Sequence, residues 1–231
     1  MTDETQKKPE YELISLKEIN EVINKRIEKI DREFKDGFNF IKNHPKSVTF
    51  FGSARTISTD NDYLTAERLA GRICKELGYS VLTGGSIGIM EAANRGAFQA
   101  GGKSLGLNIK LPKEQRENEF LTERIVFNYF FSRKVCLSFS AEAYIYFPGG
   151  FGTMDELFEI LTLVQTGKIA KAPIILVGSY FWNNFDSFIK ENLLKGKKIA
   201  DKDLELYTIT DDEDKILEII KSAPVRVGNE H

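Results

Sequence analysis

The first hydrophobic pattern along the chain has the period of an α-helix. Six apolar residues recur at spacings of three and four: Leu16, Ile19, Ile23, Ile27, Ile30 and Phe34. This spacing places them on one face of a helix. The stretch "SLKE" at 15–18 has the form of a capping box, with Ser15 as the N-cap. We therefore predict an amphipathic helix that begins at Ser15 and ends near Gly37, because a glycine often closes a helix.

From residue 46 onward, short and continuously apolar runs alternate with helical stripes. The runs are predicted to be strands: 47–52, 79–85, 103–109, 124–130, 143–150 and 172–178. The stripes are predicted to be helices: 66–77, 87–102, 132–140, 153–167, 181–194 and 211–222. Buried strands separated by helices indicate a parallel sheet covered on both faces. We therefore expect an α/β fold, with a Rossmann-like doubly wound parallel sheet over 46–231 and an N-terminal helical extension over 1–45.

Composition and charge restrict the classes of partner. The 231 residues are 42% hydrophobic and 29% charged, with a net charge of −2, so the overall charge does not favour nucleic acid or an anionic membrane. No apolar run is long enough to span a bilayer. The start "MTDETQKKPE" lacks the apolar core of a signal peptide. We expect a cytoplasmic protein without a nucleic-acid or membrane partner.

Histidine and cysteine are scarce, and this limits the chemistry. The two histidines are His44, before a proline, and His231; both are interpreted as bystanders. Acid–base work must then fall to carboxylates, lysine, tyrosine or water, and a histidine-rich metal site is excluded. Cys74 and Cys136 lie among apolar residues in predicted helices, which indicates buried thiols rather than a disulfide or a nucleophile. We expect no metal and no cofactor.

Small residues follow three of the predicted strands. The stretches are "FFGSAR" (50–55), "LTGGSIGIM" (82–90) and "FPGGFGTMDE" (147–156). The carboxyl ends of parallel strands share one edge of the sheet, where ligands bind. The second and third stretches run into helices, whose N-terminal N–H groups suit a phosphate, and Ser86 and Thr153 could add hydroxyl donors. The pattern predicts a phosphate site, although tight strand-to-helix turns would use the same residues.

The spacing of these glycines narrows the class of ligand. It matches neither the G-x-G-x-x-G dinucleotide fingerprint nor the G-x-x-x-x-G-K-[ST] loop. A mononucleotide or another small phosphate is therefore favoured over NAD or ATP hydrolysis.

Glu156 lies one turn into the helix that follows the third stretch. A carboxylate beside a phosphate would repel it, so this side chain is predicted to act on a neutral part of the ligand or to accept hydrogen bonds from hydroxyls. An acid in the first turn also complements the helix dipole, and both interpretations stay open.

Three motifs together resemble a known family. They are "PGGFGTMDE", which fits P-G-G-x-G-T-x-x-E, "SRK" at 132–134, and "GGSIGIMEAANRGA". Over about residues 46 to 200 the chain is similar to the Lonely Guy family, and "GLNIKLPKEQ" and "YFFSRK" are typical of its longer bacterial type. Its members are cytokinin riboside 5'-monophosphate phosphoribohydrolases, in bacteria often AMP nucleosidase-like, and were formerly mislabelled lysine decarboxylases. One departure is "TGGS", where many relatives have a third glycine.

The resemblance implies hydrolysis of the N-glycosidic bond of a nucleoside 5'-monophosphate, giving a free base and ribose 5-phosphate. It implies a catalytic pair, Arg133 and Glu156, although Arg133 alone could be a surface helix charge. Together with the glycine stretches it implies these substrate-binding residues: Ser53, Gly84, Gly85, Glu114, Lys134, Gly149, Gly150, Gly152, Thr153 and Thr162. It also implies a homodimer or higher homo-oligomer with active sites near the interface.

Two alternatives to this activity stay open. The first is a non-catalytic sensor or binder of a nucleotide-derived ligand, which would keep the phosphate loops without using the acid. The second is a pyridoxal-dependent decarboxylase. That chemistry needs a Schiff-base lysine, and we find no lysine placed in a suitable loop.

Overall fold

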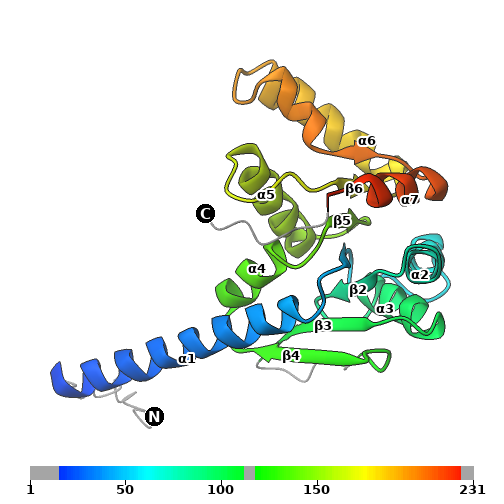
Figure 1. Ribbon diagram of the computed structural model, residues 1–231. Helices are drawn as coiled ribbons and strands as arrows, with labels where there is room; N and C mark the ends of the chain where they lie inside the picture. The colour runs from blue at the N-terminus through cyan, green and yellow to red at the C-terminus, as the bar shows by residue number, and fades with distance from the viewer. Residues whose placement is uncertain (1–15, 112–117, 225–231) are drawn as a thin grey trace, which may run out of the picture.

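The computed structural model describes residues 16–111 and 118–224, and its strands form one seven-stranded sheet (Figure 1). The strand order is β4-β3-β2-β1-β5-β6-β7, and every neighbouring pair is parallel. The strands are β1 Ser47–Phe51, β2 Ser80–Thr83, β3 Ser104–Ile109, β4 Glu123–Phe127, β5 Ala143–Tyr146, β6 Ile174–Leu176 and β7 Thr208–Ile209. This confirms the predicted parallel sheet, although the two-residue edge strand β7 is too short to leave a pattern in the sequence.

Helices connect the strands. The α-helices are α1 Leu16–Lys42, α2 Asn61–Arg72, α3 Ile89–Gln99, α4 Phe130–Ser138, α5 Phe151–Gln165, α6 Ser179–Phe188 and α7 Glu213–Ser222. Three shorter segments complete them: the π-helical η1 Ile73–Leu77 and η2 Ile189–Leu194, and the 3₁₀-helical η3 Asp201–Leu206. Gly78, at φ 69°, ends the α2–η1 segment, as its position after the predicted stripe indicated.

The core forms two layers, one on each face of the sheet. Because strand residues alternate between faces, Phe50 and Phe51 lie in different layers. The first layer packs against α2, α3 and α7 through residues such as Leu69 and Ile216. The second packs against α4, α5 and α6 through residues such as Trp182. Helices therefore cover both faces, as expected for a doubly wound sheet.

The predicted end of the first helix is wrong. Helix α1 continues through Gly37 to Lys42. A Cβ built at Gly37 would lie 2.5 Å from Cys136 Sγ and 2.9 Å from Phe127 Cζ, so this glycine lets α1 pack closely on α4 and β4 instead of closing the helix. The predicted N-cap, Ser15, lies outside the described residues.

The two halves of α1 have different surroundings. Phe34, Phe40 and Ile41 pack against the second core layer, whereas Ile19, Ile23 and Ile27 are 40–58% exposed. Figure 1 shows the first turns of α1 extending beyond the sheet. No helix in the described ranges has both the length and the apolar character that a bilayer crossing requires.

Both cysteines are free thiols. Cys136 is buried and Cys74 is half-buried, and burial raises the pKa of Cys136 to about 12 and that of Cys74 to about 11. Both groups therefore stay protonated near neutral pH, which fits the predicted inert thiols.

Candidate functional site

The three glycine-containing stretches meet at the carboxyl edge of the sheet. They follow β2, β1 and β5, which are neighbours in the centre of the sheet. The backbone N–H of Ser53 donates to Pro148 O at 3.0 Å, and the N–H of Ile89 donates to Ser53 O at 3.1 Å. Ser53 therefore joins all three, which confirms that they share one edge. In a doubly wound sheet this position, where the strand order reverses, is where ligands bind.

In the second stretch, the fold itself requires glycine. Gly85 and Gly88 have φ of +70° and +74°, a conformation that favours glycine. A Cβ at Gly84 would lie 2.5 Å from Arg133 Nη2. The main chain is thus packed against the guanidinium of Arg133 and needs no ligand to explain its composition.

In the third stretch, packing explains only one of the three glycines. A Cβ at Gly149 would lie 2.5 Å from Thr153 Cβ, whereas one at Gly150 or Gly152 would meet nothing within 4 Å. Neither of these two has a positive φ. They lie at the N-terminus of α5, where the first main-chain N–H groups of a helix have no partner within the helix. An anion could approach the backbone closely at this point.

Glu156 is buried one helical turn beyond these glycines. It is 9% exposed, its backbone carbonyl accepts a hydrogen bond from Tyr146 Oη at 3.2 Å, and its Oε2 has no hydrogen-bond partner. Burial raises the pKa of Glu156 to about 7, the charges of Lys134 and Arg133 oppose this shift, and those of Glu159 and Asp155 add to it. The carboxyl can therefore gain and lose a proton near neutral pH.

Arg133 approaches the same place from α4. Its Nε is buried without a hydrogen-bond partner, and burial lowers its pKa, an effect that the charge of Glu156 partly offsets. A guanidinium keeps its proton even so. Arg133 and Glu156 are thus a cation and an acid, close enough to affect each other's charge, and each has a polar atom left to bind something else.

Lys134 faces two other carboxylates. Its Nζ lies 2.7 Å from Asp155 Oδ2 and 2.7 Å from Glu159 Oε2, so it links α4 to α5. This places its charge near Glu156 and neutralises part of the negative charge on the first turns of α5.

Of the predicted substrate residues, one lies away from this cluster and one cannot be placed. Thr162 is exposed and donates to Phe158 O within its own helix at 2.7 Å. It lies six residues after Glu156, which is about 9 Å along a helix axis. Glu114 lies outside the described residues.

Asn108 is a residue of the site that sequence reasoning missed. It lies near the end of β3, and its Nδ2 donates to Gly85 O at 3.1 Å, while its Oδ1 is buried without a partner. The main chain at Gly85 is therefore fixed from a third strand. A polar residue at the end of an apolar strand was the available signal.

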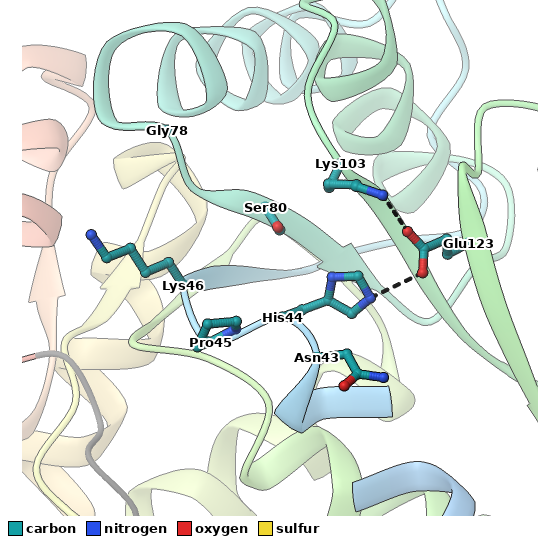
Figure 2. Close-up of a pocket in the computed structure, with 8 residues that line it drawn as sticks. All are labelled: Asn43, His44, Pro45, Lys46, Gly78, Ser80, Lys103 and Glu123. Carbon is teal, nitrogen blue, oxygen red and sulfur yellow. Dashed lines mark hydrogen bonds and ion pairs between the residues drawn. The ribbon is translucent and has the colours of Figure 1, made fainter. Parts of the chain in front are cut away.

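A hollow of about 480 Å³ lies at the opposite edge of the sheet (Figure 2). Its lining comes from the segments that precede β1, β2 and β3 and from the first residues of β2 and β4. His44, which is 8% exposed, has its Nε2 3.2 Å from Glu123 Oε2, and Lys103 Nζ lies 2.5 Å from Glu123 Oε1. His44 is thus buried and paired far from the glycine stretches, in keeping with a bystander in the chemistry.

The described residues contain no cluster of three or more histidine, cysteine, aspartate or glutamate side chains that could hold a metal ion.

Comparisons with known proteins find one matching family model. It is described as "Possible lysine decarboxylase" and matches residues 90–220. A cytokinin riboside 5'-monophosphate phosphoribohydrolase from Rhodococcoides fascians is 27% identical over 157 residues, covering 66% of this chain and 78% of that protein. A phosphoribohydrolase of the same name from Arabidopsis thaliana is 31% identical over 117 residues, covering 50% of this chain and 55% of that protein. The chain thus spans about half the length of the plant relative.

Solved structures share the fold. A molybdenum cofactor carrier protein from Chlamydomonas reinhardtii is 23% identical with a TM-score of 0.55, covering 76% of this chain and 96% of that one. A molybdenum cofactor binding protein from Rippkaea orientalis is also 23% identical, with a TM-score of 0.53, covering 76% and 94%. At this identity the likeness concerns the fold alone.

Proposed function

The chain belongs to the family described as "Possible lysine decarboxylase", the Lonely Guy family that its motifs resemble, and from this premise we propose that it is a nucleoside 5'-monophosphate phosphoribohydrolase. Its substrate would be AMP or an N6-modified AMP. The names of the bacterial and plant relatives support this activity. The structural observation that carries the proposal is Glu156: a buried acid with a pKa of about 7 and an unpartnered oxygen, one turn beyond an open helix N-terminus.

The phosphate would bind at the N-terminus of α5. The open space at Gly150 and Gly152 lets an oxyanion reach the N–H groups there, and the helix dipole favours its charge. Thr153, buried at 7% exposure, would add a hydroxyl. Gly84, Gly85 and Ser53 would form the neighbouring wall through their main chain. This anchoring would let binding energy from the phosphate support cleavage at the sugar.

Glu156 would carry out the hydrolysis. The bond between C1′ and the base nitrogen breaks with its electrons leaving on the base, and the sugar passes through an oxocarbenium-like state that a carboxylate stabilises. Glu156 in its ionised form would take a proton from water, whose oxygen adds to C1′. The departing base gains a proton, so the products are free base and ribose 5-phosphate. A pKa of about 7 lets one carboxyl accept and return this proton.

Arg133 and Lys134 would support this reaction with charge. Arg133 cannot act as a base because it stays protonated. We propose that it orients Glu156 and contacts the nucleotide, since part of its guanidinium is buried and unpartnered. Lys134 would act mainly by compensating the carboxylates of Asp155 and Glu159.

The family description also raises decarboxylation, which these residues do not fit. Pyridoxal chemistry requires a lysine that is neutral when it attacks the carbonyl carbon. Of the lysines that the structure describes at this site, Lys134 is held by two carboxylates. Burial alone would lower the pKa of Lys134, but Asp155 and Glu159 outweigh it and keep the pKa above its ordinary value. A lysine stabilised as a cation is unsuited to form a Schiff base.

The test is to incubate the purified protein with AMP, other nucleoside monophosphates and adenosine, and to measure free base by chromatography. We expect adenine from AMP and almost none from adenosine, because adenosine lacks the phosphate anchor. Equal rates on both would contradict the phosphate site. Tight AMP binding without turnover would instead support a sensor or binder.

We further propose that the protein acts in the cytoplasm as a homodimer or higher homo-oligomer. The exposed apolar residues on the first half of α1 support the assembly. The division into an extension at 1–45 and a catalytic domain at 46–231 stays a prediction.

A further inference from the structure

Glu33 is a buried carboxylate on α1 that binds the start of α4. It is 7% exposed. Its Oε1 accepts hydrogen bonds from the Asn128 backbone N–H at 2.7 Å and from Asn128 Nδ2 at 2.8 Å. Its Oε2 accepts from the Tyr129 N–H at 3.3 Å and from the Ser132 hydroxyl at 2.5 Å. All of these donors lie between the end of β4 and the first turn of α4.

This arrangement holds the turn that leads into α4, a helix whose N-cap residue, Tyr129, supplies no side-chain capping bond. The carboxylate of Glu33 accepts from the N–H groups of Asn128 and Tyr129, just before the first helical residue, and its charge complements the helix dipole. Burial alone would raise the pKa of Glu33, but the bonds from Ser132, Asn128 and Tyr129 outweigh it and hold the pKa below its ordinary value. Glu33 therefore remains ionised near neutral pH.

The turn that Glu33 binds leads directly into the site. Ser132 precedes Arg133, and the Arg133 N–H makes a long bond of 3.3 Å to Tyr129 O in this same turn. The Arg133 guanidinium lies against Gly84 and has no hydrogen bond or ion pair among the described residues that would hold its direction. The direction of this side chain thus depends on how α4 begins.

We propose that Glu33 is a positioning residue, whose carboxylate fixes the first turn of α4 and thereby directs Arg133 toward Glu156. The inference rests on the proposed function, since it assigns the effect to catalysis. Helix α1 would then contribute to the site through Glu33, although it lies outside the glycine stretches that form the site.

The test compares Glu33→Gln with Glu142→Gln. Glu142 is a matched control: it is also buried, at 4% exposure, and accepts a backbone N–H, that of Ser47 at 2.7 Å, but it lies at the opposite edge of the sheet. Both variants should lose stability. Only Glu33→Gln should lower kcat for AMP, on the order of tenfold or more, because misplacing a group near the reacting centre is costly.

A second readout separates positioning from stability. The charge of Arg133 lowers the pKa of Glu156, alongside that of Lys134, while Glu159 and Asp155 raise it. If Arg133 turns away, the pKa seen in the rate profile of Glu33→Gln should rise above that of the wild type. In Glu142→Gln it should not move. Ser132→Ala removes one donor to Glu33. It should lower kcat and raise the pKa in the pH–rate profile, as Glu33→Gln does, but by less. This variant provides the test if Glu33→Gln fails to fold.

The outcomes also separate this inference from the proposed function. An active wild type with unchanged kcat and profile in Glu33→Gln and Ser132→Ala would overturn the positioning role. If the wild type does not hydrolyse AMP, the proposed function fails, and positioning is then read from AMP affinity by calorimetry. Affinity should fall in Glu33→Gln and hold in Glu142→Gln; an equal loss in both would overturn the inference.

Discussion

At the scale of single residues, the central property is the burial of the Glu156 carboxyl. An exposed glutamate would be fully ionised at neutral pH, but burial brings this one close to half-ionised. The nearby cations Arg133 and Lys134 limit the shift, and the nearby acids Glu159 and Asp155 enlarge it. The pKa of the Glu156 carboxyl therefore depends on four neighbouring charged side chains, and removing any one of them should change it.

The rate should depend on pH through this group. If the ionised form of Glu156 takes the proton from water, as we propose, kcat/KM for AMP should be low at pH 5, rise through about 7 and then level off. The measurement is initial rate against pH with AMP below its KM. A flat profile from pH 5 to pH 8, or an inflection near the ordinary glutamate value, would contradict the assignment.

Glu156→Gln should separate chemistry from binding. It keeps the shape and removes the charge, so turnover should fall on the order of a hundredfold or more, while AMP binding should hold or tighten because less negative charge faces the phosphate. Arg133→Ala should both weaken binding and slow the reaction, because a guanidinium contributes to both. Calorimetry beside single-turnover rates tests this. Parallel loss of AMP affinity and rate in Glu156→Gln would make the carboxylate a ligand contact.

The same substitution should change stability with a definite sign. The pKa of Glu156 is raised from 4.5 to about 7 in the folded protein, so its contribution to the free energy of unfolding is full below pH 4.5 and is lost as pH rises through about 7. Glutamine has no such loss. Relative to the wild type, the free energy of unfolding of Glu156→Gln should thus rise between pH 4.5 and pH 8, by up to roughly 3 kcal/mol. Urea unfolding curves at several pH values measure this difference.

At the scale of elements, the site depends on where helices begin. Helix α5 begins at open glycines, and α4 begins at a carboxylate supplied by α1. The first start leaves N–H groups available to a ligand, and at the second the carboxylate binds the turn just before the helix and the Ser132 hydroxyl. One helix can therefore bind the phosphate while the other holds a side chain in place.

Gly152→Ala should test the open helix start. A Cβ there meets nothing within 4 Å, and alanine favours a helix over glycine by roughly 0.8–1.0 kcal/mol, so the variant should be as stable as the wild type or more so. If a phosphate approaches this backbone, the methyl group would displace it. Losing a hydrogen bond to a charged group costs about 1.5–3 kcal/mol, so AMP affinity should fall roughly tenfold or more. Unchanged AMP affinity in calorimetry would place the phosphate elsewhere.

The elements that could be predicted from the sequence are those marked by a pattern within a short segment. Alternating apolar runs predicted the sheet, and the glycine stretches predicted its functional edge, because turn chemistry is visible in a few residues. Gly37 misled the helix prediction because its role is contact with Cys136 from another helix. Glu33 interrupts an apolar stripe between Ile30 and Phe34, but its partners are about a hundred residues away in the chain, so its purpose could not be seen locally.

At the scale of the whole molecule, the two edges of the sheet have different characters. The carboxyl edge carries the glycine stretches and the unpartnered polar atoms of Arg133 and Glu156. The other edge holds the hollow in which His44 and Lys103 pair with Glu123. The first half of α1 extends beyond the sheet (Figure 1).

The projecting half of α1 should take part in self-association. Ile23 and Ile27 are 47% and 58% exposed, and burying such side chains against a second copy would be favourable. We expect sedimentation at micromolar concentration to give at least a dimer of the 26.2 kDa chain, and Ile23→Lys with Ile27→Lys to weaken it. Leu64→Lys, on α2 and also exposed at 46%, is the control. A compact monomer for the wild type would contradict the assembly.

The position of β1 between β2 and β5 has a consequence for the order in which the molecule forms. Val48 pairs with Val81 on one side and with Ala143 on the other, and the second partner is made much later during synthesis. Closing such a distant contact slows folding. Ser53 cannot bond to Pro148 before β5 is in place, so the proposed nucleotide site is complete only after most of the chain has been synthesised. Bound AMP would then stabilise only chains in which β5 has paired with β1. A proteolysis assay during refolding, with and without AMP, would show when this pairing has formed, because AMP would protect the chain only from that point.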